Sequence, residues 1–72
     1  MLLDVRGLRC PMPLLKLKQA LQNLPSGGLL TVLTTDPGSV RDFEAFFRQS
    51  GHILLTQVST GDEFRFEIQK RP

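Results

Sequence analysis

The chain has 72 residues, nine basic and seven acidic, so its net charge is +2, and 40% of its residues are hydrophobic. This length predicts one domain over residues 1–72 with a small core, because so short a chain buries only about 60% of its unfolded surface. One cysteine and one histidine exclude a disulfide framework and a zinc site, and no apolar run approaches the roughly 18 residues that span a bilayer. We therefore expect a cytoplasmic protein without metal, cofactor or membrane.

The first half of the chain predicts a strand, a helix and a second strand. Apolar and polar residues alternate from Leu2 to Arg6, as in a short strand. Leucines recur at helical spacing from Pro11 to Leu24, and Pro25-Ser26-Gly27-Gly28 ends this helix. The apolar, β-branched stretch from Leu29 to Thr35 predicts a second strand. This strand runs parallel to the first if the helix crosses over between them.

The second half predicts another helix followed by a hairpin. Asp36 or Ser39 caps this helix and Gly51 ends it. The strands His52–Thr60 and Glu63–Lys70 are joined by a tight turn at Gly61-Asp62. The residues expected to face the core are Val40, Phe43, Phe46, Phe47, Phe64, Phe66 and Ile68. The order β-α-β-α-β-β predicts an α/β (α+β type) two-layer sandwich, with a mixed four-stranded sheet and two helices on one face.

The only cysteine, Cys10, lies between the first strand and the first helix, in Arg9-Cys10-Pro11-Met12-Pro13. Pro11 is predicted at the first helical position and Cys10 as the N-cap. The helix dipole and the neighbouring Arg9 then lower the pKa of the thiol and favour the thiolate, which is the nucleophile. The prolines fix the backbone beside the sulfur. These residues predict an exposed, moderately activated catalytic Cys10 rather than a small buried hydrophobe.

The residues around Cys10 also predict a docking surface. Met12 and Leu15 point away from the leucine stripe of the first helix, so they offer apolar contacts to a partner. Arg6, Arg9, Lys16 and Lys18 form a basic rim that favours an acidic protein partner. Nucleic acid is a weaker alternative, because the strands lack the pattern of aromatic and basic residues typical of RNA recognition.

The segment Leu3-Asp4-Val5-Arg6-Gly7-Leu8-Arg9-Cys10-Pro11-Met12-Pro13-Leu14-Leu15-Lys16 strongly resembles the opening of the TusA/SirA-like sulfur-carrier family, with its Cys-Pro-x-Pro signature. Asp36-Pro37 with Asp42, and Gly51-His52, extend the resemblance over essentially the whole chain. The resemblance implies the same sandwich fold and a persulfide on Cys10. It also implies a cysteine desulfurase or rhodanese-type protein as sulfur donor and a second protein as acceptor, in tRNA thiolation, cofactor assembly or sulfur oxidation.

Other functions stay open from the sequence. The alternative to a sulfurtransferase-like carrier is a non-catalytic interaction or redox-regulatory module in which Cys10 is a sensor or a cap. A cysteine hydrolase is disfavoured, because His52 is far from Cys10 in sequence and is expected to be structural. Asp36 and Asp42 are interpreted as a helix cap and a first-turn acid. Many relatives carry a second cysteine before Gly51-His52, and its absence here excludes a two-thiol mechanism within one chain.

Overall fold

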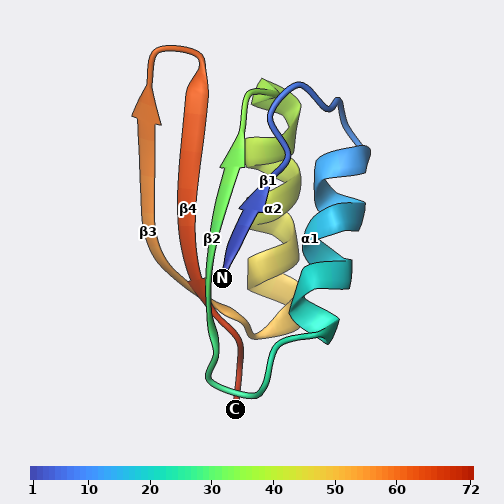
Figure 1. The fold of residues 1–72 in the computed structure, drawn as a ribbon, viewed down its shortest axis with the longest axis vertical. Helices are drawn as coiled ribbons and strands as arrows, with labels where there is room; N and C mark the ends of the chain where they lie inside the picture. The colour runs from blue at the N-terminus through green and yellow to red at the C-terminus, as the bar shows by residue number, and fades with distance from the viewer.

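A computed structural model describes all residues 1–72 and places two helices against one face of a four-stranded sheet (Figure 1). The elements are β1 (Leu2–Asp4), α1 (Met12–Gln22), β2 (Leu29–Thr34), α2 (Pro37–Ser50), β3 (Ile53–Thr60) and β4 (Glu63–Gln69). The predicted order and fold class are therefore confirmed. β1 is shorter than predicted, because the carboxylate of Asp4 accepts a hydrogen bond from the backbone N–H of Arg6 and turns the chain out of the strand.

The sheet has the strand order β1-β2-β4-β3. β1 and β2 are parallel, with Leu3 opposite Val32, as the crossover through α1 requires. β4 is antiparallel to both β2 and β3, so the sheet is mixed. Thr60 pairs with Glu63 across the hairpin, and Gly61 has a φ of 60°. This pairing confirms the predicted two-residue turn.

The core lies between the two helices and the covered face of the sheet. The aromatic rings of Phe43 in α2 and Phe66 in β4 meet edge to face, with centroids 5.0 Å apart. The buried hydrophobic residues are Val5, Leu17, Ala20, Leu21, Leu30, Val32, Phe43, Phe47, Phe66 and Ile68. These residues come from both helices, from β2 and β4 and, for Val5, from the segment directly after β1, so the core joins the two layers.

The parallel strands place both helix starts at one end of the molecule. The loop after β1 leads into α1, and the loop after β2 leads into α2, at the upper end of the view in Figure 1. Asp36 caps α2 as predicted, since its side chain accepts a hydrogen bond from the N–H of Gly38. Gly51 ends α2 with a φ of 82°. Neither helix has the length and apolar character needed to cross a bilayer.

Candidate functional site around Cys10

Cys10 is exposed in the loop between β1 and α1, but it does not cap the helix. The N–H of Met12 donates to the carbonyl of Arg9, which forms a turn ahead of the helix, and α1 begins only at Met12 with Pro11 as its N-cap. The Cys10–Pro11 peptide bond is cis. The predicted capping role of Cys10 is therefore wrong, because this extra turn separates the thiol from the first helical residue.

Two carboxylates from the neighbouring segment hold Cys10. The backbone N–H of Cys10 donates to Oδ2 of Asp36 at 2.7 Å, and the thiol Sγ donates to Oδ2 of Asp42 at 2.6 Å. Asp36 precedes α2 and Asp42 lies on its second turn, so this helix supplies both acceptors. The close approach of the two segments places a thiol that is open to solvent within hydrogen-bond reach of a carboxylate.

The electrostatics of Cys10 are the opposite of the sequence-based expectation. The hydrogen bond to Asp42 raises the pKa of the Cys10 thiol, and local desolvation and the negative charges of Asp42 and Asp36 raise the pKa further. The predicted lowering of this pKa is wrong, because acidic rather than basic groups surround the sulfur. The thiol is therefore held in its protonated form, with a base next to it.

Sequence reasoning missed Asp36 and Asp42 as hydrogen-bond partners of Cys10, Asp36 for its backbone N–H and Asp42 for its thiol. The cap assigned to Asp36 is confirmed, but the same carboxylate also binds the Cys10 backbone. Asp42 is not a first-turn acid, since the first turn of α2 contains none. Their positions in the sequence could have indicated these contacts. Cys10 follows β1, Asp36 and Asp42 follow β2, and parallel neighbouring strands place the loops that follow them at the same edge of the sheet.

The two prolines of the motif have different surroundings. Pro11 is exposed, and its carbonyl accepts a hydrogen bond from the N–H of Leu15 at 3.1 Å. Pro13 is fully buried, one helical turn before Leu17 on the face of α1 that meets the sheet. Pro13 is therefore part of the buried face of α1, and its role beside the sulfur remains a prediction.

The predicted docking residues are exposed on α1 near Cys10. The exposed fractions are 41% for Met12 and 45% for Leu15, and Lys16 and Lys18 are exposed as well. Arg9 is exposed in the turn and forms no ion pair. These residues belong to the turn at Cys10 and to the helix that follows it, and their part in binding remains a prediction.

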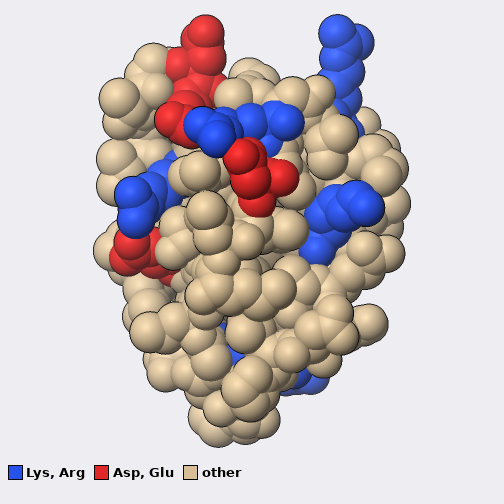
Figure 2. Space-filling model, viewed as in Figure 1, with Lys and Arg blue, Asp and Glu red and all other residues tan.

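Arg6 does not belong to a free basic rim. Its guanidinium forms ion pairs with Asp4 at 2.7 Å and with Glu63 at 2.9 Å. Figure 2 shows acidic and basic side chains intermixed at the upper end of this face rather than a continuous basic patch. The mild positive charge near Cys10 therefore rests on Arg9, Lys16 and Lys18.

His52 is not part of this site. It follows the carboxyl end of α2, whereas Cys10 lies beside the amino end of that helix (Figure 1). Its Nδ1 accepts a hydrogen bond from the backbone N–H of Arg71, which fits the predicted structural role. The structure contains no group of three or more His, Cys, Asp or Glu side chains placed to hold a metal ion. The chemistry of the site therefore rests on one thiol and its carboxylate.

Comparisons with known proteins identify the family of this chain. The family model described as Sulfurtransferase TusA matches residues 1–70. The chain is 47% identical to the sulfur carrier protein TusA of Allochromatium vinosum, over 94% of this chain and 90% of that protein. It is 43% identical to the sulfur carrier protein TusA of Pseudomonas putida, over 97% of this chain and 88% of the relative. A SirA-like protein from Desulfitobacterium hafniense has the same fold, with a TM-score of 0.83, 23% identity and coverage of 99% of this chain and 97% of that one. With this match over nearly its whole length, the chain belongs to the TusA sulfurtransferase family.

Proposed function

We propose that Cys10 accepts sulfane sulfur from a donor protein as a persulfide and passes it to an acceptor protein. The observation that carries this proposal is the exposed thiol hydrogen-bonded to Asp42 at 2.6 Å. Family membership supports it, because the named relatives are sulfur carrier proteins. A carrier needs an accessible sulfur and a means of releasing its proton, and this pair of side chains supplies both.

The acceptance step is a displacement at sulfur. As the donor's persulfide approaches, Asp42 takes the proton of Cys10, and the thiolate attacks the terminal sulfur of the donor. A sulfur–sulfur bond forms on Cys10 while the sulfur–sulfur bond of the donor breaks, and the donor leaves as a thiolate that collects the proton. The separation of 2.6 Å between Sγ and Oδ2 lies within the range for a general base.

The release step repeats the same chemistry with the roles exchanged. The thiol of the acceptor protein gives its proton to Asp42 and attacks, as a thiolate, the terminal sulfur of the Cys10 persulfide. The sulfur–sulfur bond of the persulfide breaks, and Cys10 leaves as a thiolate that takes this proton from Asp42. No oxidant, reductant or cofactor enters either step, because sulfane sulfur only moves between thiols. A single thiol in the chain is therefore sufficient for carriage.

The exposed α1 surface beside Cys10 is the proposed docking site for donor and acceptor. Met12 and Leu15 provide apolar contact, and Arg9, Lys16 and Lys18 provide positive charge around it. Such an arrangement of an apolar centre and a charged rim is common at protein interfaces. We infer that a cysteine desulfurase or a rhodanese-type protein binds here as the donor, with an acidic surface opposite the lysines.

The test is intact mass spectrometry after incubation with a cysteine desulfurase and cysteine. We expect the mass of one added sulfur on the wild-type chain, its removal by a thiol reductant, and no addition to Cys10→Ser. The second candidate function is the non-catalytic module, which the raised pKa of Cys10 favours because it lowers the thiolate fraction at neutral pH. An unmodified wild-type chain with every desulfurase and rhodanese-type donor would leave that module as the better account.

A further inference from the structure

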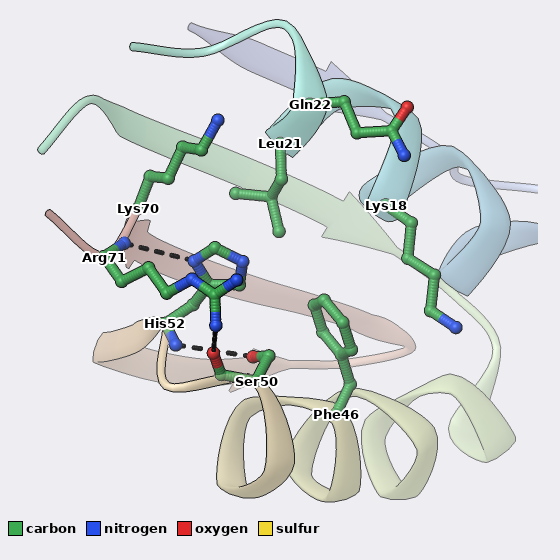
Figure 3. Close-up of a pocket in the computed structure, with 8 residues that line it drawn as sticks. All are labelled: Lys18, Leu21, Gln22, Phe46, Ser50, His52, Lys70 and Arg71. Atoms are coloured by element: carbon green, nitrogen blue, oxygen red, sulfur yellow. Dashed lines mark hydrogen bonds between the residues drawn. The ribbon is translucent and has the colours of Figure 1, made fainter. Parts of the chain in front are cut away.

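A hollow of about 400 Å³ lies towards the carboxyl ends of the two helices, whereas Cys10 precedes the start of α1. Figure 3 shows the residues that line the hollow. Its wall combines the second half of α1, the end of α2 and the residues after β4. The lining residues are Lys18, Leu21, Gln22, Phe46, Ser50, His52, Lys70 and Arg71. This volume lies within the range of small-molecule sites. Neither Cys10 nor its partners Asp36 and Asp42 line it, and Lys18 is the one residue shared with the proposed docking surface.

The ionisable side chains of this lining are all bases. Lys18, Lys70 and Arg71 carry positive charge, and no Asp or Glu lies among the lining residues. Burial lowers the pKa of His52, and the charges of Arg71 and Lys70 lower it further, as a positive local potential requires. Uncompensated cations around a hollow favour an anionic ligand.

Lys70 and Arg71 each keep N–H groups that make no hydrogen bond within the protein. The ammonium of Lys70 donates to the carbonyl of Leu24 at 2.6 Å, which leaves two of its N–H groups. The guanidinium of Arg71 donates through Nη1 to the carbonyl of Ser50, which leaves Nε and Nη2. These cations neutralise the carbonyl ends of the helices, yet they keep donors for a further acceptor.

His52 contributes one more donor with a fixed tautomer. Its Nδ1 accepts the backbone N–H of Arg71 at 3.1 Å, so the proton of the neutral ring lies on Nε2. Phe46 provides apolar surface beside His52, and the centroids of the two rings are 5.7 Å apart (Figure 3). The ammonium of Lys18 lies 5.5 Å from the centre of the Phe46 ring.

We propose that this hollow binds a small phosphate monoester, with the phosphate on the basic groups and the organic part against the ring of Phe46. Three cations and a neutral imidazole N–H match the several acceptor oxygens of a dianionic phosphate better than they match a single carboxylate. The apolar wall distinguishes an ester from inorganic phosphate. This site is separate from Cys10, so it binds its ligand whether or not the thiol carries sulfur.

The test is an NMR titration of the full chain at about 0.15 M ionic strength, where exposed charges are screened beyond about 8 Å. The probes are AMP, adenosine and inorganic phosphate. We expect saturable shifts centred on His52 and Phe46 with AMP, at least about threefold weaker binding of inorganic phosphate, and no saturable shift with adenosine. Bound AMP should also raise the pKa of His52, because the negative phosphate offsets the positive charges of Arg71, Lys70 and Lys18. Glu44 and Arg48 lie on the other side of the imidazole ring, and their charges are the same in all samples.

Two lysines of α1 provide matched variants. Lys18→Gln removes a cation of the lining, whereas Lys16→Gln removes the same charge from the same helix outside the hollow. We expect about threefold weaker AMP binding in Lys18→Gln and nearly unchanged binding in Lys16→Gln. Equal effects of the two substitutions, equal affinity for AMP and inorganic phosphate, or the absence of saturation at millimolar AMP would overturn the proposal.

Discussion

At the scale of single residues, the hydrogen bond between Cys10 and Asp42 reconciles two demands on a carrier thiol. Between encounters the sulfur must stay protonated, because a free thiolate reacts with oxidants and electrophiles. During transfer the same sulfur must lose its proton. A carboxylate 2.6 Å away stabilises the protonated thiol and is also placed to accept its proton. Asp42 is thus the residue whose substitution separates these two effects.

Asp42→Asn should make Cys10 more acidic but a poorer sulfur acceptor. Loss of the negative charge and of the strong acceptor lowers the pKa of the thiol, so the pH midpoint of its alkylation by iodoacetamide falls. Loss of the base slows persulfide transfer from the donor by at least about tenfold.

Asp62→Asn is the control, since it removes the same charge at the exposed hairpin tip. This control should leave both the alkylation profile and the transfer rate unchanged. Transfer by Asp42→Asn at the wild-type rate, or faster, would contradict a role for the carboxylate as the base. The pH midpoint of alkylation and the rate together distinguish this role from simple support of the loop.

At the scale of elements, the first turn of α1 combines the motif with the core. Pro13→Ala removes buried ring atoms next to Leu17 and frees the unfolded backbone, so we expect a loss of about 1–2 kcal/mol in the free energy of unfolding. Pro11→Ala changes an exposed position and should cost less than about 1 kcal/mol. Urea unfolding of the two variants measures this difference. Equal losses would contradict the burial of Pro13 as its main contribution.

The end of β1 is tied to β4 through Arg6, which pairs with Asp4 and with Glu63. Hydrogen bonds from Arg6 lower the pKa of Asp4 to about 2. The carboxyl group of Asp4 therefore binds a proton more readily in the unfolded chain than in the folded one. The stabilisation that results from ionised Asp4 is complete above the ordinary aspartate pKa of about 3.9 and is lost as the pH falls towards 2.

The prediction is that Arg6→Gln reduces the pH dependence of the free energy of unfolding between about pH 4 and pH 2. Arg41→Gln is the control, because Arg41 is exposed and forms no ion pair. Urea unfolding at several pH values gives the slope for each variant. If the free energy of unfolding of Arg6→Gln depends on pH as steeply as that of the wild-type chain, the ion pair between Arg6 and Asp4 does not contribute to stability.

At the scale of the whole molecule, the thiol lies at the end where both helices start, and the exposed apolar residues Met12 and Leu15 follow it on α1. Leu15→Glu places a charge on this surface, and since the side chain is 45% exposed the variant should fold normally. We expect about tenfold weaker binding to the sulfur donor, as for a contact residue in an interface. Isothermal titration calorimetry with the donor measures the affinity.

Leu55→Glu is the matched control for this prediction. Leu55 is 48% exposed on β3, and the substitution introduces the same charge on the sheet. The control should bind the donor as the wild-type chain does. If Leu15→Glu is folded and binds with unchanged affinity, or if both variants lose binding equally, the α1 surface is not the docking site.

The sequence predicts most of this fold, because its periodic patterns are dictated by packing. The alternation of Phe66 and Ile68 predicts β4, and the helical spacing of the leucines predicts α1. Gly51 correctly marks the end of α2. The same reasoning assigns Asp36 correctly as a cap, since capping depends only on residues nearby in the chain. Local chemistry is therefore readable from the sequence alone.

The two errors about charge concern contacts between segments distant in sequence. The pKa of Cys10 is set by a carboxylate 32 positions away, and the charge of Arg6 is paired with Glu63, 57 positions away. Pro13 was taken as part of the motif, although its spacing of four to Leu17 places it on the buried face. A periodic pattern shows which face of a helix is buried, but not which side chains of another element meet a given loop.

The central claim, that Cys10 carries sulfur from one protein to another, is tested most directly by following labelled sulfur through a single turnover. A cysteine desulfurase charged with isotopically labelled cysteine is mixed with the chain, the loaded chain is separated, and an acceptor thiol is added. We predict that mass spectrometry finds the label first on the Cys10 peptide and then on the acceptor, with no transfer through Cys10→Ser. Label that never reaches Cys10, that stays there when the acceptor is added, or that reaches the acceptor equally through Cys10→Ser would contradict the account.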